Sequence, residues 1–348
     1  MEKVRFGVVG TNFITDWMIA GAVQDNRFEL AAVCSRTEER AEECAGRYDI
    51  PHRFTSLEEM AASPYIDAVY VATPNSLHAS QSIMCMSYGK HLLCEKPLAS
   101  NAVEARKMVA ASERYNVTLM EAMKPSLTPN FKSVLDNIGK VGKVRRYFSS
   151  YCQYSSRYDR FKAGEQVNAF NPEYSNGAVM DIGVYTIYPM VVLFGMPEQI
   201  TASGTVLPSG TDGQGSVLFR YPGMEASVLY SKISDSYLPT EIQGEEGTML
   251  IDRINRIGNV SFIPRRQKVT GGRGDAALPM DLTCVAEKDE YYYEVTEFID
   301  LVISGRREST INSHRNSVAV MEIVDEIRHQ TGIVFPADRN GHCAAGKL

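Results

Sequence analysis

Short apolar runs alternate with amphipathic stretches along the first third of the chain. The apolar runs predict strands, which fall at 4–9, 28–34, 67–72, 91–94 and 117–121. The stretches between them carry apolar residues at helical spacing and predict helices near 13–24, 37–47, 78–88 and 101–115. Strands that alternate with helices are typical of βαβ units, which build a parallel sheet. The pattern therefore predicts an α/β domain over residues 1–122.

The pattern changes over residues 123–348. Apolar and polar residues alternate one by one, which predicts antiparallel strands joined by Pro/Gly turns at 143–154, 199–206, 216–221 and 226–231. Three helices are also expected, at 177–195, 289–304 and 314–330. The first of these is apolar along most of its length, and Gly195 and Pro197 mark its end. We therefore expect a second domain of the α+β class with a mostly antiparallel, open sheet.

The composition is that of an ordinary globular protein with room for two hydrophobic cores. The 348 residues are 44% hydrophobic and 22% charged, with a net charge of -6. A nucleic acid or an anionic membrane would need a concentrated positive surface, and no basic cluster is visible, so neither is expected as a partner. No apolar run approaches the roughly 20 residues that span a bilayer.

The cysteines and the start of the chain bear on the compartment. The seven cysteines are scattered without a C-x-x-C pair, as is typical of reduced cytosolic proteins. An apolar strand begins at residue 4, which leaves no room for a leader peptide. The six histidines are equally dispersed. We therefore expect a cytoplasmic protein without a metal site.

The turn after the first strand is a candidate binding element. Residues 10–15 read G-T-N-F-I-T where a G-x-G-x-x-G dinucleotide fingerprint belongs, with only its first glycine retained. Gly10 permits the tight turn, and the N–H groups after it open a helix whose positive end suits a pyrophosphate. Asn12 replaces a glycine with a side chain that must point away from the phosphate or bind it. A plain strand-to-helix turn is the alternative. The predicted cofactor contacts are Gly10, Thr11, Asn12, Phe13 and Ile14.

The end of the second strand bears on which nicotinamide cofactor is bound. An Asp or Glu at this point accepts hydrogen bonds from the ribose 2′-hydroxyl of NAD, whereas arginine accommodates the 2′-phosphate of NADP. Ser35 and Arg36 stand there, and Arg40 follows one helical turn later. These residues favour NADP(H) and leave NAD(H) open. The alternative is a pair of arginines that only face solvent.

Two further loops belong to the same edge of the predicted sheet, where ligands of open parallel sheets bind. The strand at 91–94 is followed by Glu95, Lys96 and Pro97. A lysine in this position faces a bound cofactor, so Lys96 is a candidate catalytic residue; a solvated lysine is the alternative. The loop after the strand at 67–72 flanks the expected nicotinamide ribose through Ala72, Thr73, Pro74, Asn75 and His78.

The apolar helix at 177–195 carries a second candidate element. Asp181 and Tyr185 are spaced i, i+4, so both project from one face. Burying a carboxylate costs several kcal/mol unless it is paired. Asp181 therefore belongs either to a structural ion pair or to a working site, and Lys96 is the obvious partner.

These residues together resemble the glucose-fructose oxidoreductase/inositol dehydrogenase/rhizopine-catabolism (Gfo/Idh/MocA) family over essentially the whole chain. The matching segments follow the family's order and approximate spacing: GVVGT at 7–11, ATPN at 72–75 with His78, EKP at 95–97 and DIGVY at 181–185. Tyr185, where many members carry histidine, is similar to the branch of glucose-fructose oxidoreductase, anhydrofructose reductase and dimeric dihydrodiol dehydrogenase. Residues 121–123 (EAM) resemble the same branch. Asn12 and Tyr188 depart from the family pattern, in the cofactor and the substrate region respectively.

The resemblance implies a Rossmann fold in the first domain and reversible hydride transfer between nicotinamide C4 and a carbinol carbon of a sugar, polyol or cyclic diol. Tyr185 would be the acid/base, with its pKa lowered by the Lys96 ammonium. Lys96 would also stabilise the developing alkoxide, while Asp181 would orient both residues. The resemblance further implies cofactor contacts from Glu95, Lys96 and Met123, and a homodimer or homotetramer.

The substrate-side candidates are weaker, because a solvated rim explains these polar residues equally well: Lys124, Tyr154, Arg157 and Asn171. Two other functions use the same fold. A sugar-sensing regulator would bind dinucleotide without turnover, and the retention of Lys96, Asp181 and Tyr185 argues against it. A redox-assisted glycosidase would keep NAD bound, and an acid would be expected where this chain has Ser35.

Overall fold

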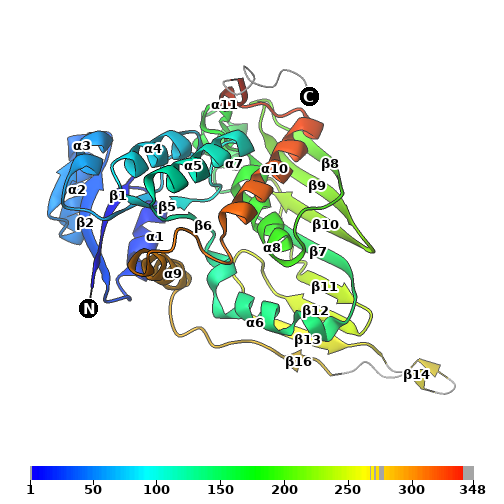
Figure 1. The fold of residues 1–348 in the computed structure, drawn as a ribbon. Helices are drawn as coiled ribbons and strands as arrows, with labels where there is room; N and C mark the ends of the chain where they lie inside the picture. The colour runs from blue at the N-terminus through cyan, green and yellow to red at the C-terminus, as the bar shows by residue number, and fades with distance from the viewer. Residues whose placement is uncertain (1, 267, 270–271, 274–277, 340–348) are drawn as a thin grey trace.

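Two sheets lie side by side, the first in the N-terminal half of the chain and the second in the C-terminal half (Figure 1). The computed structural model describes residues 2–266, 268–269, 272–273 and 278–339. The expected α/β domain followed by a mostly antiparallel α+β domain is confirmed.

The first sheet has six parallel strands in the described part of the chain, in the order β3-β2-β1-β4-β5-β6. They are β1 Val4–Val9, β2 Phe28–Cys34, β3 His52–Phe54, β4 Ala68–Val71, β5 His91–Glu95 and β6 Leu119–Ala122. This order reverses at β1, and the carboxyl ends of β1 and β4 meet at the switch point where dinucleotides bind. The five predicted strands are confirmed. The short edge strand β3 was not predicted.

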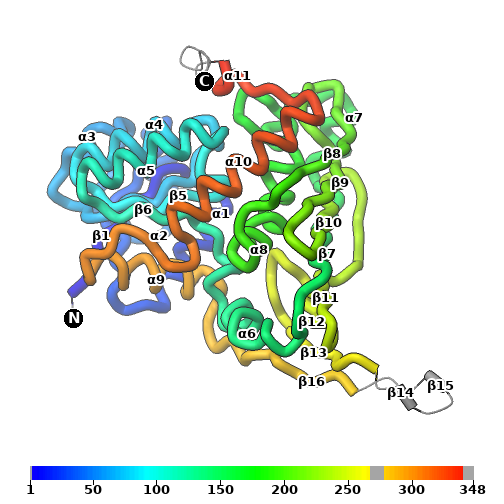
Figure 2. Tube along the Cα trace, turned by 45° about the vertical axis from the view of Figure 1, so that its right-hand side comes forward, coloured from blue at the N-terminus to red at the C-terminus, as the bar shows by residue number. Residues whose placement is uncertain are grey.

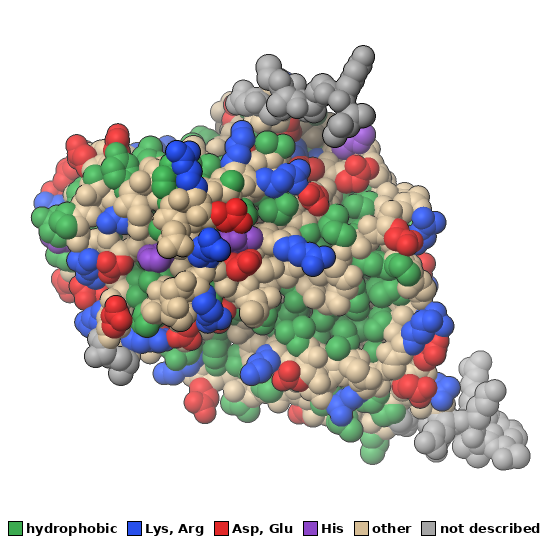
Figure 3. Space-filling view, in the orientation of Figure 1, with side chains coloured by type: hydrophobic (Ala, Val, Ile, Leu, Met, Phe, Trp, Pro, Cys, Tyr) green, Lys and Arg blue, Asp and Glu red, His purple; other side chains and the backbone are tan. Residues whose placement is uncertain are grey.

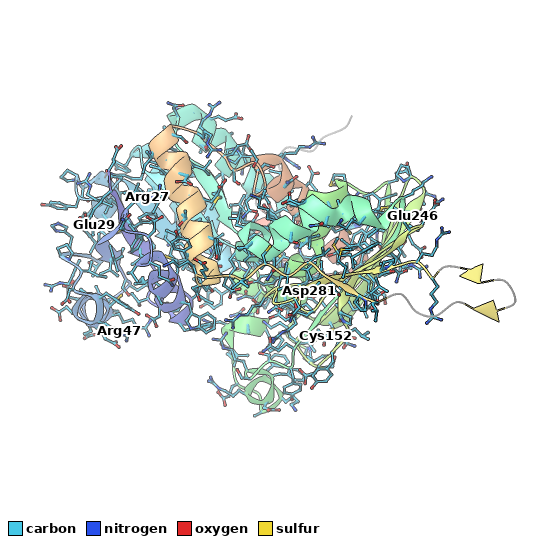
Figure 4. All side chains as sticks on the ribbon, turned by 90° about the horizontal axis from the view of Figure 1, so that it is seen from below. Arg27, Glu29, Arg47, Cys152, Glu246 and Asp281 are labelled. Carbon is cyan, nitrogen blue, oxygen red and sulfur yellow. The ribbon has the colours of Figure 1, made fainter. Side chains whose placement is uncertain are left out.

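Helices cover both faces of the first sheet. They are α1 Phe13–Ala22, α2 Glu38–Tyr48, α3 Leu57–Ala62, α4 Asn75–Ser87 and α5 Ala102–Tyr115. Side chains cap several of them, including Asn12, Thr37 and Asn101, each of which accepts a hydrogen bond from an N–H of the first turn. The helix α9 Glu290–Ser304 returns from the second half of the chain to pack on α1. Arg27 lies beside α9 (Figure 4) and forms an ion pair with Asp300 at 2.6 Å.

The second sheet has eight strands in the described residues, in the order β16-β13-β12-β11-β7-β10-β9-β8. They are β7 Val144–Cys152, β8 Gln199–Val206, β9 Asp212–Tyr221, β10 Met224–Ser231, β11 Thr240–Gly244, β12 Gly247–Ile251, β13 Val260–Pro264 and β16 Met280–Asp281. Among these strands β7 and β10 run parallel, and the other neighbours run antiparallel. Separately, β14 Lys268–Val269 pairs antiparallel with β15 Gly272–Arg273.

One face of the second sheet is covered by helices, and α10 runs between the two domains (Figure 2). The helices of this half are α6 Pro129–Asn137, α7 Tyr158–Lys162, α8 Val184–Phe194, α10 His314–Thr331 and the short α11 Pro336–Arg339. Val320, Val324 and Ile327 of α10 are fully buried in a core that includes residues of both sheets. The two domains therefore share apolar packing.

The helix predicted over 177–195 begins differently from the expectation. Val179–Gly183 form a π-helical turn, and α8 follows it directly. The stretch Pro172–Phe194 is long and apolar enough to cross a membrane by length and composition, but 72% of its most apolar window is buried inside the fold. This burial is typical of a core helix in a folded domain.

Charged side chains of both signs are interspersed over the face seen in Figure 3. The described residues of that face form no single basic patch (Figure 3). Six cysteines are free thiols, and Cys343 lies outside the described residues.

Candidate active site

A cavity of about 780 Å³ opens at the carboxyl edge of the first sheet, lined by residues of both domains. Its volume falls within the roughly 300–1,000 Å³ that is typical of ligand sites. Loops after β1, β2, β4 and β5 supply one wall, and residues between 157 and 181 supply the other. All the predicted cofactor residues except Met123 line it: Gly10, Thr11, Asn12, Phe13, Ile14, Ser35, Arg36, Arg40, Ala72, Thr73, Pro74, Asn75, His78, Glu95 and Lys96.

The turn after β1 needs a glycine at one position only. Gly10 has a φ of +96°, and a Cβ there would lie 2.6 Å from the carbonyl oxygen of Ala72. Asn12 has extended backbone angles, so it needs no glycine. Its Oδ1 accepts a hydrogen bond from the Ile14 N–H, and its Nδ2 donates to the Ala72 carbonyl, both at 2.8 Å. The asparagine therefore replaces the second glycine without backbone strain and joins this turn to the loop after β4.

The end of β2 forms a positive rim of the cavity. Ser35 is buried, and its hydroxyl lies 3.5 Å from that of Thr11. Arg36 and Arg40 are exposed, and neither is ion-paired to a carboxylate among the described residues. The two guanidinium groups are therefore free to meet an anionic ligand.

His78 connects two loops of the site. It is fully buried, and its two ring nitrogens each lie 2.9 Å from a carbonyl oxygen, of Thr73 and of Pro97. Burial lowers the pKa of the imidazole. The ring thus holds the loop after β4 against the turn that carries Lys96. Asn75 reaches across the domains and donates to the Ser175 carbonyl at 2.9 Å.

Lys96 and Asp181 meet at the cavity wall. The Lys96 ammonium donates to Asp181 Oδ1 at 3.1 Å and to the Asp181 main-chain oxygen at 2.8 Å. The second carboxylate oxygen, Oδ2, binds the ammonium of Lys232. Burial would raise the pKa of Asp181, but the two lysines outweigh it and hold the pKa well below its usual range. Burial likewise opposes the Lys96 charge, and the carboxylates of Asp181 and Glu95 more than compensate, so the pKa of Lys96 is raised.

Tyr185 packs under the ammonium of Lys96. The Lys96 Nζ lies 4.9 Å from the centre of the phenol ring, and Tyr151 meets the same ring edge to face at 5.6 Å. The expected lowering of the tyrosine pKa is wrong for this structure. Burial raises the pKa of Tyr185 well above 10, and the Glu95 carboxylate adds to the effect. The Lys96 ammonium over the ring does not reverse this direction.

Buried carboxyl groups lie behind the lysine. Glu95 accepts a hydrogen bond from the Tyr70 hydroxyl at 2.5 Å, and burial raises its pKa. Glu294 is fully buried, and neither carboxyl oxygen has a hydrogen-bond partner among the described residues. Glu121 accepts from the Leu98 N–H through Oε1, while its Oε2 has no such partner among those residues. Burial raises the pKa of Glu121 to about 7.

We expect Glu121→Gln to flatten the pH dependence of stability. The folded protein binds the Glu121 proton more tightly than the unfolded chain, whose pKa is near 4.5. The free energy of unfolding should therefore fall as pH rises from about 4.5 to about 7, by at most about 3 kcal/mol from this group. Thermal melts of both proteins at several pH values measure the difference. If the melting temperatures of the two proteins differ by the same amount at every pH in this range, the assignment is contradicted. Glu113→Gln, at an exposed position of α5, is the matched control.

The substrate-side predictions fall in different places. Arg157 lines the cavity, and its guanidinium lies 5.6 Å from the ring of Phe13, at the start of α1. Lys124 does not line the cavity and is ion-paired to Glu290 of α9. The Tyr154 hydroxyl donates to Asp159 at 2.7 Å.

The two remaining predicted residues also lie off the cavity. Asn171 Oδ1 accepts from the Glu173 N–H and caps the turn Pro172–Tyr174. Met123, which directly follows β6, is buried and does not line the cavity. Arg157 is therefore the substrate-side candidate that the cavity includes, and it lies beside the start of α1.

Two site residues were missed by the sequence reasoning. Lys232, which directly follows β10, binds Asp181. Asp212, which begins β9, accepts hydrogen bonds from the N–H groups of Ala178 and Val179, both at 2.8 Å, and so fixes the start of the π-helical turn. A Cβ on Gly177 would lie 2.3 Å from Asp212 Oδ1, so this approach requires the glycine. Neither residue lies in a motif, and both have polar or glycine neighbours in the sequence, so no local signal marks them.

A metal centre is not part of the described site. Among the described residues, no group of three or more His, Cys, Asp or Glu side chains could hold a metal ion.

Comparison with known proteins identifies the family. Residues 4–123 match the model of the oxidoreductase family with an NAD-binding Rossmann fold, and residues 132–250 match the GFO/IDH/MocA C-terminal domain. The chain is 48% identical over 336 residues to scyllo-inositol 2-dehydrogenase (NADP(+)) IolU of Bacillus subtilis, covering 97% of this chain and 99% of that protein. It is 27% identical to the trans-1,2-dihydrobenzene-1,2-diol dehydrogenase of Mus musculus, over 97% and 99% of the two chains.

Solved structures agree on the fold. Levoglucosan dehydrogenase, in complex with NADH and levoglucosan, superposes with a TM-score of 0.82 over 95% of this chain and 98% of that one, at 20% identity. At this identity the likeness bears on the fold alone. Together with the family models and the relatives, it leads to one conclusion: the chain belongs to the Gfo/Idh/MocA family of NAD(P)-dependent oxidoreductases.

Proposed function

We propose that the protein is an NADP-dependent dehydrogenase that oxidises a CH–OH group of a cyclic polyol such as scyllo-inositol, and reduces the corresponding ketone. One observation carries the proposal. The Lys96 ammonium is held by Asp181 at the wall of the cavity, with the Tyr185 ring beneath it. The chain that presents this arrangement is 48% identical to scyllo-inositol 2-dehydrogenase (NADP(+)) IolU.

The residues of the cavity suit a dinucleotide. The turn at Gly10 leaves the start of α1 close to the β4 loop, and the positive end of a helix favours a pyrophosphate. Arg157 adds a guanidinium beside Phe13 at the same place. We therefore assign Arg157 to the cofactor rather than to the substrate. The nicotinamide, when bound, supplies the acceptor or donor of the hydride.

Tyr185 and Lys96 would carry out the proton transfer and stabilise the charge on the reacting oxygen. In ketone reduction the carbonyl oxygen gains a proton as its carbon gains the hydride, and the Tyr185 hydroxyl is the donor. Lys96 Nζ donates a hydrogen bond to the same oxygen and stabilises negative charge that develops there. Asp181 keeps that ammonium in place through Oδ1. Because the pKa values of Tyr185 and Lys96 are both raised, both groups hold their protons at neutral pH, which suits reduction.

Arg36→Ala tests the choice of cofactor. We expect the KM for NADPH to rise about tenfold or more, which corresponds to about 1.4 kcal/mol of binding, while the KM for NADH stays unchanged. The physical reason is that Arg36 would bind the 2′-phosphate, which only NADP carries. Steady-state kinetics with both cofactors measure the two values. Arg53→Ala, which removes an arginine outside the cavity, is the control, and equal losses for NADPH and NADH would refute this role.

Turnover separates the proposal from its alternatives. Purified protein should reduce NADP+ when scyllo-inositol is added, and reduced cofactor should accumulate in excess of the protein. A sugar-sensing regulator would bind the nucleotide and give no turnover. A redox-assisted glycosidase would hydrolyse a glycoside with no net cofactor reduction.

We further propose that the boundary between the two domains lies between residues 122 and 123.

We also propose that the protein forms a homodimer or homotetramer. The second sheet has an outer face that helices do not cover, and Leu218 on that face is 58% exposed. Sedimentation would measure the oligomer, and Leu218→Glu should weaken it.

The six described free thiols support a reducing compartment, which we take to be the cytoplasm.

A further inference from the structure

Lys232 is a buried lysine whose charge the proposed reaction does not use. Its side chain is 4% exposed, so water cannot satisfy the ammonium. The ammonium binds Asp181 Oδ2, lies 3.4 Å from the Ala169 carbonyl oxygen and lies 5.1 Å from the centre of the Phe170 ring. Within the described residues, Asp181 is the carboxylate to which it is ion-paired. A buried ammonium is costly unless it is paired and hydrogen-bonded, so this arrangement needs a reason.

The backbone holds Lys232 in place independently of its charge. The Lys232 N–H donates to the Gly213 carbonyl at 2.8 Å, next to Asp212, which fixes the turn that carries Asp181. The ends of β9 and β10 therefore position both the lysine and the carboxylate that it binds. These backbone hydrogen bonds fix where the lysine and its partner carboxylate enter the site, as a preorganised site requires.

The two lysines divide the Asp181 carboxylate between them. Oδ1 accepts from Lys96, and Oδ2 accepts from Lys232. With Oδ2 occupied, the carboxylate cannot turn to hold Lys96 through both oxygens. Asp181 takes two of the three N–H groups of Lys96, through Oδ1 and the main-chain oxygen, so the third remains for the reacting oxygen.

We propose that Lys232 is a positioning residue for the reaction: it fixes the Asp181 carboxylate and so keeps the Lys96 ammonium directed at the reacting oxygen. Lys232 acts through Asp181 and does not touch the substrate. Its contact with Ala169, which lines the same cavity wall as Asp181, ties that part of the wall to the carboxylate. This inference rests on the proposed dehydrogenase function.

The test compares Lys232→Met with Lys90→Met, using scyllo-inositol and NADP+. Lys90 is also a partly buried lysine, but its ammonium donates to the main-chain oxygens of Ser63 and Ile66, away from the cavity. We expect kcat to fall about 100-fold in Lys232→Met, the scale of a displaced catalytic group. NADPH affinity, followed by cofactor fluorescence, should not change, and Lys90→Met should keep the kcat of the unmodified protein.

A double-mutant cycle with Asp181→Asn separates positioning from a structural role. If Lys232 acts through the Asp181 charge, Lys232→Met lowers kcat no further in the Asp181→Asn background. Additive losses, or an unchanged kcat in Lys232→Met, would overturn the inference. The double variant lacks both charges. Its kcat can be compared with that of Asp181→Asn even if Lys232→Met alone does not fold. Absence of turnover by the unmodified chain would instead refute the proposed function.

Discussion

Lys96→Met is expected to lower kcat for scyllo-inositol oxidation roughly 10²- to 10³-fold, the loss measured when one donor to a developing oxyanion is removed. The Lys96 side chain is 13% exposed at the cavity wall and its ammonium is held by two oxygens of Asp181, so its position is fixed before the substrate arrives. Methionine is one atom shorter than lysine, keeps its unbranched shape and removes the charge. Steady-state kinetics with saturating NADP+ measure the change.

Cofactor binding provides the control for this variant. The predicted phosphate contacts lie in the β1 and β2 turns, so Lys96→Met should change the NADPH dissociation constant far less than it changes kcat. Lys96→Met with an unchanged kcat would remove Lys96 from the mechanism. Loss of NADPH binding together with kcat would mean that the lysine supports the cavity as a whole.

Tyr185→Phe is expected to lower kcat roughly 10²- to 10⁴-fold, the usual contribution of a general acid or base. The substitution removes one oxygen and leaves the ring, which packs against Tyr151 and under Lys96. The fold and the affinity for NADPH should therefore not change. Tyr151→Phe is the matched control, because it removes a hydroxyl from the neighbouring ring while its own hydroxyl bonds Gln153.

The pH profile distinguishes the tyrosine from other proton carriers. Because the pKa of Tyr185 lies above 10, the residue is protonated at neutral pH. Ketone reduction needs that proton, so its rate should stay level from pH 7 to about 10. Polyol oxidation needs the deprotonated form, so its rate should rise with pH over the same range. A Tyr185→Phe enzyme that keeps this rise would show that another group accepts the proton.

Five of the six described parallel strands were predictable because each is a mostly apolar, mostly buried run. β1, with the sequence VRFGVV, is buried at five of its six positions. β3 has three residues and none is fully buried, so no apolar run marks it. The helix at 177–195 was predictable from its composition, but its π-helical start depends on Asp212, which is more than 30 residues away in the chain.

Site residues in motifs were predictable, whereas their electrostatics were not. Lys96 and Asp181 were found because their positions at a sheet edge and in an apolar helix are unusual for charged residues. Lys232 was missed because its partner comes from another element and no local pattern accompanies it. The direction of the Tyr185 pKa was wrong because it depends on burial and on the nearby Glu95 carboxylate, which the chain order does not encode.

The most direct measurement is transfer of deuterium from ring-deuterated scyllo-inositol to NADP+ by the purified protein. Direct hydride transfer predicts that the NADPH formed carries one deuterium, which mass spectrometry of the cofactor detects, and that Lys96→Met forms almost none. Reduced cofactor without deuterium, or no reduced cofactor with any cyclic polyol, would contradict the assignment of this chain as a CH–OH dehydrogenase.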